Sequence, residues 1–269
     1  MPWYRMTYGS RMDNESNPSE RPAVRPIAID VVPDAGDDPG GVLHLTVHHA
    51  LLAAVCQFIP IPFLDDVAGD RVVRRLVGKL LERNGRGYGA DAVAPLYEGP
   101  ERGVADRVGG FFKGLVMKPV KKVLRTALIV ITIRRAMLTA ARVVLLGRTI
   151  DRCLARGELA DDVPEVRRRE RAVQIDAAVR DVMASPERRG LLKLIRESAS
   201  LLRDDGPAPR VPVTAAVDAD AAEASLSSNE RRRLERATAE LESKLQSEEQ
   251  RGMLASVDAA VDARMNAMA

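Results

Sequence analysis

The stretch GGVLHLTVHHALLAAVCQFIPIPFL, residues 40–64, contains no Asp, Glu, Lys or Arg, although 29% of the chain is charged. From about Leu43 its apolar residues run nearly all round a helix, which is typical of a segment buried on most sides. Pro60 and Pro62 end the helix, because a proline lacks a backbone donor and restricts the residue before it. We therefore predict an apolar helix that runs into a turn, at the centre of a helical domain.

The uncharged stretch has about the 20-residue length that crosses the hydrocarbon core of a bilayer. Its uninterrupted helical part is shorter than that, and the stretch holds three histidines and two prolines. These features favour a buried core helix or a re-entrant hairpin over a straight transmembrane helix.

The clearest amphipathic pattern in the chain follows over about residues 66–83. Apolar residues recur at the i, i+3, i+4 spacing, and bases occupy the other side of the helix. The apolar set is Val72, Val73, Leu76, Val77, Leu80 and Leu81, and the bases are Arg71, Arg74, Arg75 and Lys79. Asn84-Gly85 supplies a C-terminal stop. The two helices and residues 59–62 between them predict a helical hairpin.

Residues 107–150 show the strongest charge imbalance in the sequence, with ten basic residues and no acidic one. The bases are Arg107, Lys113, Lys118, Lys121, Lys122, Arg125, Arg134, Arg135, Arg142 and Arg148. On a helical projection, Lys121, Arg125, Arg135 and Arg142 fall within about a third of a turn of one another. The apolar pattern continues to Ile150 without turn residues, so we predict a long helix here, although residues 126–133 are β-branched enough to resemble a buried strand.

The basic segment has three interpretations. A solvated helix face usually carries interspersed acids, which this segment lacks. A nucleic-acid binder usually adds base-reading polar residues or stacking aromatics, and only Phe111 and Phe112 lie nearby. Attraction to anionic lipid requires long basic side chains beside apolar surface, which the segment supplies. We favour the lipid surface and expect the binding residues to be Lys113, Lys118, Lys121, Lys122, Arg125, Arg135 and Arg142.

Composition shifts divide the chain into five parts. We predict a disordered N-terminal arm (1–40), an apolar and basic helical domain (41–160), a helical pair (161–203), a linker (204–226) and a charged C-terminal helix (227–269) that opens on a Ser-x-x-Glu capping box. The predicted fold class is mostly α, with an apolar helical hairpin packed against long basic and amphipathic helices. The helical pair and the C-terminal helix are candidate surfaces for a protein partner.

Few residues suggest chemistry. His44 and His48 share a helix face, but Cys56 lies about 12 Å further along the axis, too far to join one tetrahedral metal site. The Gly-rich loop NGRGYG, residues 84–89, lacks the Gly-Lys-Ser/Thr ending of a phosphate-binding P-loop, so we expect a flexible connection. No Ser/His/Asp or Cys/His arrangement emerges. We predict no catalytic role, no metal and no cofactor.

Composition also bears on the fold class, the state of the cysteines and the location of the protein. Aromatic residues make up only 3% of the chain, which favours closely packed helices over an all-β fold. Cys56 and Cys153 lie in apolar or helical contexts, which favours buried thiols over a disulfide. The first twenty residues lack the apolar core of a signal peptide, so we expect the protein to lie on the cytoplasmic side of the membrane.

A short motif runs from the apolar helix into the amphipathic helix. It consists of Ile59, Pro60, Ile61 and Pro62, the acids Asp65 and Asp66, Arg74-Arg75-Leu76 and a closing Tyr88-Gly89. Over these forty or so residues the chain resembles the YcjF-like domains that accompany bacterial GTPases, and the EcsC-type proteins. This resemblance implies a helical, membrane-associated domain without an established active site.

The expected function is therefore non-catalytic. We predict a membrane-associated protein that binds or organises at the inner face of the cytoplasmic membrane, either peripherally or partly inserted. The alternative is a soluble helical scaffold or a nucleic-acid-binding protein. A third class is an enzyme whose site is assembled from residues far apart in the sequence.

Overall fold

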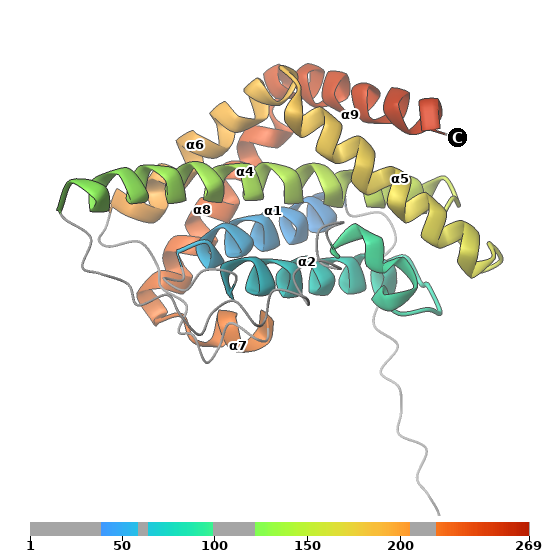
Figure 1. Ribbon diagram of the computed structural model, residues 1–269, viewed down its shortest axis with the longest axis horizontal. Coiled ribbons are helices and arrows are strands. Elements are labelled where there is room, and N and C mark those ends of the chain that lie inside the picture. The colour runs from blue at the N-terminus through green and yellow to red at the C-terminus, as the bar shows by residue number, and fades with distance from the viewer. Residues whose placement is uncertain (1–38, 59–63, 99–121, 205–218, 269) are drawn as a thin grey trace, which may run out of the picture. The chain divides into compact units, whose positions relative to one another are not determined.

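The structure, a computed structural model, describes residues 39–58, 64–98, 122–204 and 219–268, with the side chains of the long third segment described from Thr132 to Ser198. This part of the chain is helical and contains no β-strand, which confirms the predicted mostly α fold (Figure 1). The helices are α1 (Pro39–Cys56), α2 (Leu64–Arg83), the 3₁₀ helix η1 (Ala90–Leu96), α4 (Lys122–Ala155), α5 (Glu165–Ala184), α6 (Arg188–Asp204), α7 (Ala219–Ala224), α8 (Ser228–Gln246) and α9 (Glu248–Met268).

Several predicted features fall outside the described residues. These are the N-terminal arm up to residue 38, the Ile-Pro-Ile-Pro turn at 59–62, and residues 107–121 of the basic segment. All the described helices belong to one compact unit, Ala35–Ala269, which includes the predicted parts 41–160, 161–203 and 227–269.

The uncharged helix α1 is enclosed by other helices. α2, α4 and α8 all pack against it, and Figure 1 shows α1 between α4 and α2. Every residue from 50 to 57 is buried. Because α1 meets apolar neighbours on most sides, it needs no polar stripe, and this explains why its apolar residues run nearly all round the helix.

Helices α1 and α4 approach closely where Gly147 of α4 faces Thr46 of α1. A Cβ atom at position 147 would lie 2.5 Å from Thr46 Cγ2 and 2.8 Å from its Oγ1. Thr46 is fully buried, and its hydroxyl has no hydrogen-bond partner within the described residues. The absence of a side chain at Gly147 therefore permits this packing distance.

The amphipathic helix α2 buries the six apolar residues predicted to face inward. It ends in a Schellman motif, in which Arg86 N–H donates to Leu81 O (2.9 Å) and Gly85 N–H donates to Glu82 O (3.0 Å). Gly85 has a φ of 64°, which glycine adopts without steric cost. The Asn84-Gly85 stop is thus confirmed.

The C-terminal part differs from the prediction of one helix. The capping box is present, since Ser227 accepts from Glu230 N–H and the Glu230 side chain accepts from Ser227 N–H. However, the chain turns at Ser247, whose extended backbone separates α8 from α9. The short helix α7 lies within the predicted linker. Leucines 234, 241, 245 and 254 are buried inside this chain.

We predict that Gly147→Ala destabilises the protein, although alanine ordinarily favours a helix by about 1 kcal/mol over glycine. The new methyl group would collide with buried Thr46, and such overpacking costs about 1–3 kcal/mol. Gly78→Ala on α2 is the matched control, because nothing lies within 4 Å of a Cβ atom there. Urea denaturation should show a loss for Gly147→Ala, a gain for Gly78→Ala, and partial recovery when Thr46→Ala accompanies Gly147→Ala. Equal gains at both glycines would contradict the close approach.

Candidate anion-binding surface

The residues predicted to bind an anionic surface are only partly described. Lys113, Lys118 and Lys121 lie outside the described residues, as do the side chains of Lys122 and Arg125. Arg135 and Arg142 are described, and both form ion pairs with carboxylates of this chain. Anion binding by the set stays a prediction, and for these two arginines the structure shows internal partners.

Arg135 joins α4 to the beginning of α2. Its Nη1 lies 3.3 Å from Asp65 Oδ2, and its Nη2 lies 3.2 Å from Asp66 Oδ1. These are the two acids of the Ile-Pro-x-Pro motif, and both lie in the first turn of α2. Burial, followed by the neighbouring Asp66 carboxylate, raises the pKa of Asp65. The acidic end of the motif therefore anchors α4.

Arg142 joins α4 to α5. Its Nη2 donates to Asp176 Oδ1 at 2.8 Å, while Arg180, one turn along α5, lies 2.9 Å from the other carboxylate oxygen. The Asp176 side chain is only 4% exposed, whereas that of Arg142 is 32% exposed. Both oxygens of this buried carboxylate are thus paired, as a buried charge requires.

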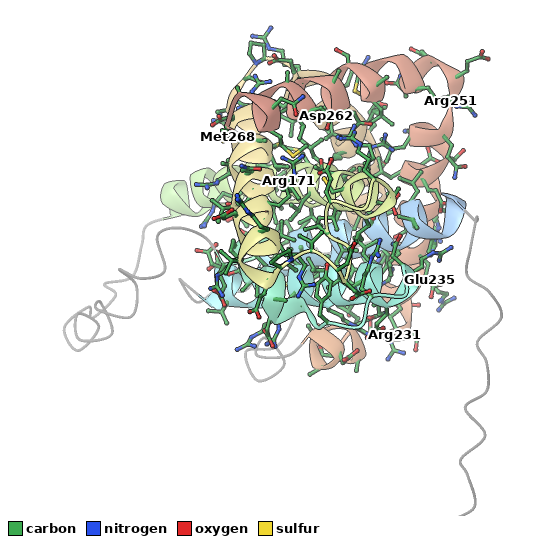
Figure 2. The ribbon with its side chains drawn as sticks, turned by 90° about the vertical axis from the view of Figure 1, so that its right-hand side faces the viewer. Arg171, Arg231, Glu235, Arg251, Asp262 and Met268 are labelled. Carbon is green, nitrogen blue, oxygen red and sulfur yellow. The ribbon has the colours of Figure 1, made fainter. Side chains whose placement is uncertain are left out.

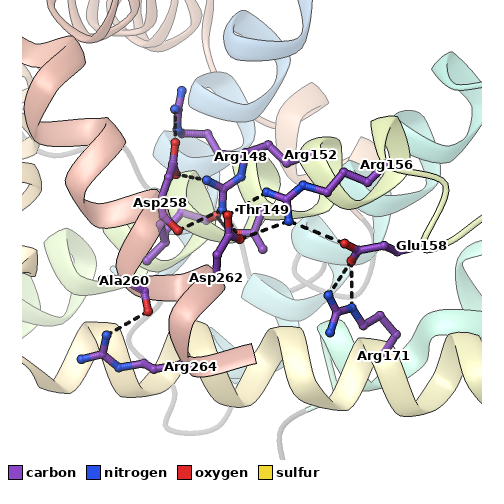
Figure 3. Close-up of polar contacts among 11 residues, drawn as sticks. Arg148, Thr149, Arg152, Arg156, Glu158, Arg171, Asp258, Ala260, Asp262 and Arg264 are labelled. Atoms are coloured by element: carbon purple, nitrogen blue, oxygen red, sulfur yellow. Dashed lines mark hydrogen bonds and ion pairs between the residues drawn. The ribbon is translucent and has the colours of Figure 1, made fainter. Parts of the chain in front are cut away.

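A larger network joins α4 to α9 and to α5 (Figure 3). Arg148 Nη2 donates to Asp258 Oδ2 (2.6 Å), and Arg152 lies 3.2 Å from both Asp258 and Asp262. Arg156 continues the row with a 2.7 Å contact to Asp262. Glu158, just past α4, pairs with Arg171 of α5 at 2.7 Å. Figure 2 shows that α9 ends at Met268 beside α5. There Gln174 Nε2 donates to the Met268 carbonyl.

The acids that the basic segment lacks are supplied by other helices. α2 contributes Asp65 and Asp66, α5 contributes Asp176, and α9 contributes Asp258. Because residues 107–150 contain no acid, the sequence of this segment gives no sign of these partners. The 34–110 residues that separate the two members of each pair leave no local spacing signal, unlike an i, i+4 pair.

The Gly-rich loop 84–89 packs against the turn between α4 and α5. Gly87 N–H donates to Asp161 Oδ1 (2.9 Å), Tyr88 Oη–H donates to Leu159 O (2.6 Å), and Arg86 Nη2 donates to Leu154 O (2.9 Å). The Arg168 guanidinium lies 4.0 Å from the centre of the Tyr88 ring. The loop is held by these contacts and uses an amide to bind a carboxylate of its own chain, which argues against a phosphate cradle.

Two histidines of α1 contact acids from the C-terminal third of the chain. His44 Nδ1 lies 2.8 Å from Glu242 of α8, and His48 Nε2 lies 3.3 Å from Glu223 of α7. Arg75 of α2 also pairs with Glu223, at 3.0 Å. Helices α1 and α2 therefore both contact α7 through the same carboxylate. Burial lowers the pKa of His48, and the Glu223 carboxylate opposes this effect.

His49 is buried, with 1% of its surface exposed. Its Nδ1–H donates to Leu45 O at 2.8 Å, one turn back along α1, and its Nε2 has no partner within the described residues. Protonation of Nε2 would place a charge in this apolar setting, and burial accordingly lowers the pKa of His49 from 6.5 to about 4.

The described residues form neither a metal site nor a membrane-spanning helix. No group of three or more His, Cys, Asp and Glu side chains in this part of the chain is arranged to hold a metal ion. Among the helices described, none is both long and apolar enough to span a bilayer. Cys56 and Cys153 are buried free thiols, and burial raises the pKa of each to about 12.

Comparison of the chain with protein-family models, with curated proteins and with solved structures gave no match.

We predict that Asp176→Ala costs about 2–4 kcal/mol of unfolding free energy, because it leaves Arg142 half-buried without its partner. Glu170→Ala is the matched control, since the Arg167–Glu170 pair is exposed and such pairs contribute about 0–1 kcal/mol. Guanidinium denaturation measures both. A similar small loss in the two variants would show that the α4–α5 pair is not important for stability.

We predict that acid lowers stability through His49. Its pKa of about 4 in the folded state lies below 6.5, so the unfolded state binds more protons between these values. The stability contributed by His49 is complete above about pH 6.5 and falls by about 3 kcal/mol as the pH drops to about 4. Urea denaturation from pH 7.5 to 4 should show a shallower decline for His49→Gln than for the wild type or His44→Gln. Identical slopes in all three proteins would contradict the assignment.

Proposed function

We propose that the protein is a non-catalytic binding protein that acts at the anionic cytoplasmic surface of a membrane. Its lipid-binding segment is residues 111–125, at and just before the start of α4. The observation that carries this proposal is the internal pairing of Arg135, Arg142 and Arg148. That pairing assigns a structural role to these three arginines and leaves the bases at the beginning of the segment as candidates for an external anion.

The chemistry of the proposed segment suits a lipid surface. It reads FFKGLVMKPVKKVLR and contains no acid. Its bases are Lys113, Lys118, Lys121, Lys122 and Arg125. Each base near an anionic bilayer contributes about 1 kcal/mol, so the set supplies on the order of 5 kcal/mol at low salt. Apolar residues between the bases allow the long side chains to reach the headgroups while their stems cover apolar surface.

The helical body gives such a segment a firm attachment. α4 begins at Lys122 and runs for 34 residues, about 51 Å, into the packed core. Lipid binding at its start would therefore position the whole unit. The resemblance of the Ile-Pro-x-Pro motif to YcjF-like and EcsC-type domains supports the same location.

A protein partner and an alternative function accompany this proposal. A protein partner would bind the outer faces of the C-terminal helices α8 and α9, because their inner faces pack against one another and the core. A soluble helical scaffold is the alternative function. Binding of nucleic acid is less favoured, because aromatic residues that could stack on bases are scarce.

Vesicle sedimentation tests the proposal. The wild-type protein should bind phosphatidylserine-containing vesicles, bind phosphatidylcholine vesicles far less, and dissociate as salt rises. Lys118→Gln/Lys121→Gln/Lys122→Gln should weaken binding about tenfold or more, since three charges are removed. Arg71→Gln/Arg169→Gln/Arg232→Gln removes the same charge from exposed positions on three other helices and should bind nearly as the wild type does. No binding by the wild type would leave the scaffold as the function.

A further inference from the structure

One face of α6 carries three exposed bases in a row. Arg189, Lys193 and Arg196 are all exposed, and their i, i+4, i+7 spacing places them within about 60° of one another around the helix axis. The opposite face buries Leu191, Leu194, Ile195 and Ser198 against the rest of the chain. The three bases therefore form a stripe that points away from the core, here called the α6 basic stripe.

The α6 basic stripe differs from the arginines of this chain that pair with carboxylates. Internal ion pairs involve Arg74, Arg75, Arg135, Arg142, Arg148, Arg152, Arg156, Arg167, Arg171, Arg180 and Arg264. Among the side chains that the structure describes, no acidic partner is seen for any member of the stripe. Glu197, the acid next to it on α6, lies 3.6 Å from Lys244 of α8. These eleven arginines have acidic partners within the chain, whereas Arg189, Lys193 and Arg196 face solvent.

The residues around the stripe indicate what kind of anion it suits. α6 reads RRGLLKLIRESASLLRD, with no aromatic residue to stack on a base and no Asn or Gln to read a base edge. The stripe presents only positive charges at the ends of long, flexible side chains. An anionic lipid surface requires only that, because polybasic segments are attracted by surface potential and not by a fixed pattern of hydrogen bonds.

The position of α6 connects the stripe with the proposed lipid-binding segment. α6 packs against α4, and Figure 1 shows it crossing behind the half of α4 that begins at Lys122. Two sets of bases on neighbouring helices can engage one extended surface at the same time, which strengthens binding beyond either set alone.

We infer that the α6 basic stripe is a second contact with the anionic membrane surface, additional to residues 111–125. The inference rests on the proposed membrane function and adds to it a surface on the folded body. Contact at two helices fixes how the helical unit is oriented on the bilayer, whereas one segment alone would only tether it.

The test compares Arg189→Gln/Lys193→Gln/Arg196→Gln with the wild type in sedimentation with phosphatidylserine-containing vesicles. Binding should weaken about tenfold or more, because three surface charges are lost. Thermal unfolding should be unchanged, since these side chains have no acidic partners to lose. Arg71→Gln/Arg169→Gln/Arg232→Gln is the control for net charge and should bind nearly as the wild type does.

The outcomes separate the inference from the proposed function. If only the Lys118/Lys121/Lys122 variant loses binding, the second contact is refuted and the membrane function stands. If the α6 variant and the control weaken equally, net charge explains the effect and the inference fails. If the wild type binds no vesicles, both fail. If the α6 variant keeps vesicle binding but loses binding to a single-stranded oligonucleotide, the stripe serves nucleic acid instead.

Discussion

The contact of α1 with α4, at Gly147 and Thr46, is possible only because one of the two helices lacks a side chain at the crossing. α1 carries no charged residue, so it is stable in water only when other helices cover it. α4, α2 and α8 provide that cover, and each contributes an apolar face to the same core. The apolar faces of the surrounding helices follow from this requirement, because a helix that covers α1 must be apolar toward it and polar toward solvent.

Around this core, α4 forms ion pairs with other helices in addition to its apolar contacts. Its arginines reach carboxylates of α2, α5 and α9, so one helix is linked to three others. Partly exposed ion pairs contribute little stability individually. Their stronger effect is on specificity, because a different arrangement of these helices would leave Asp176, which is nearly buried, without Arg142 as the partner of one of its oxygens. Residues 107–150 contain no acid, and their arginines are thus paired with acids from other parts of the chain.

The sequence predicts the helices well and their partners poorly. The apolar periodicity of α2, the Asn84-Gly85 stop and the Ser227–Glu230 capping box are local patterns, and the structure confirms each of them. The turn at Ser247 was missed because no Gly or Pro marks it. The acids that pair with α4 could not be found from the sequence, because pairing across helices depends on packing and leaves no periodic signal. The histidines of α1 are a similar case, since their acidic partners on α7 and α8 follow them by 175 residues or more.

The loop after α2 and the turn after α4 bring two helix ends to one corner of the molecule. Each helix closes with a glycine at positive φ, Gly85 and Gly157, and a helix carries a partial negative charge at its C-terminal carbonyls. Two such ends placed together would repel each other. Arg86 donates to the carbonyl of Leu154, in the last turn of α4, so its guanidinium offsets the converging dipoles. Arg168 donates to the carbonyls of Ala160 and Asp161 in the turn that follows. The charged hydrogen bond at this corner therefore keeps the C-terminal ends of α2 and α4 next to each other without a covalent link.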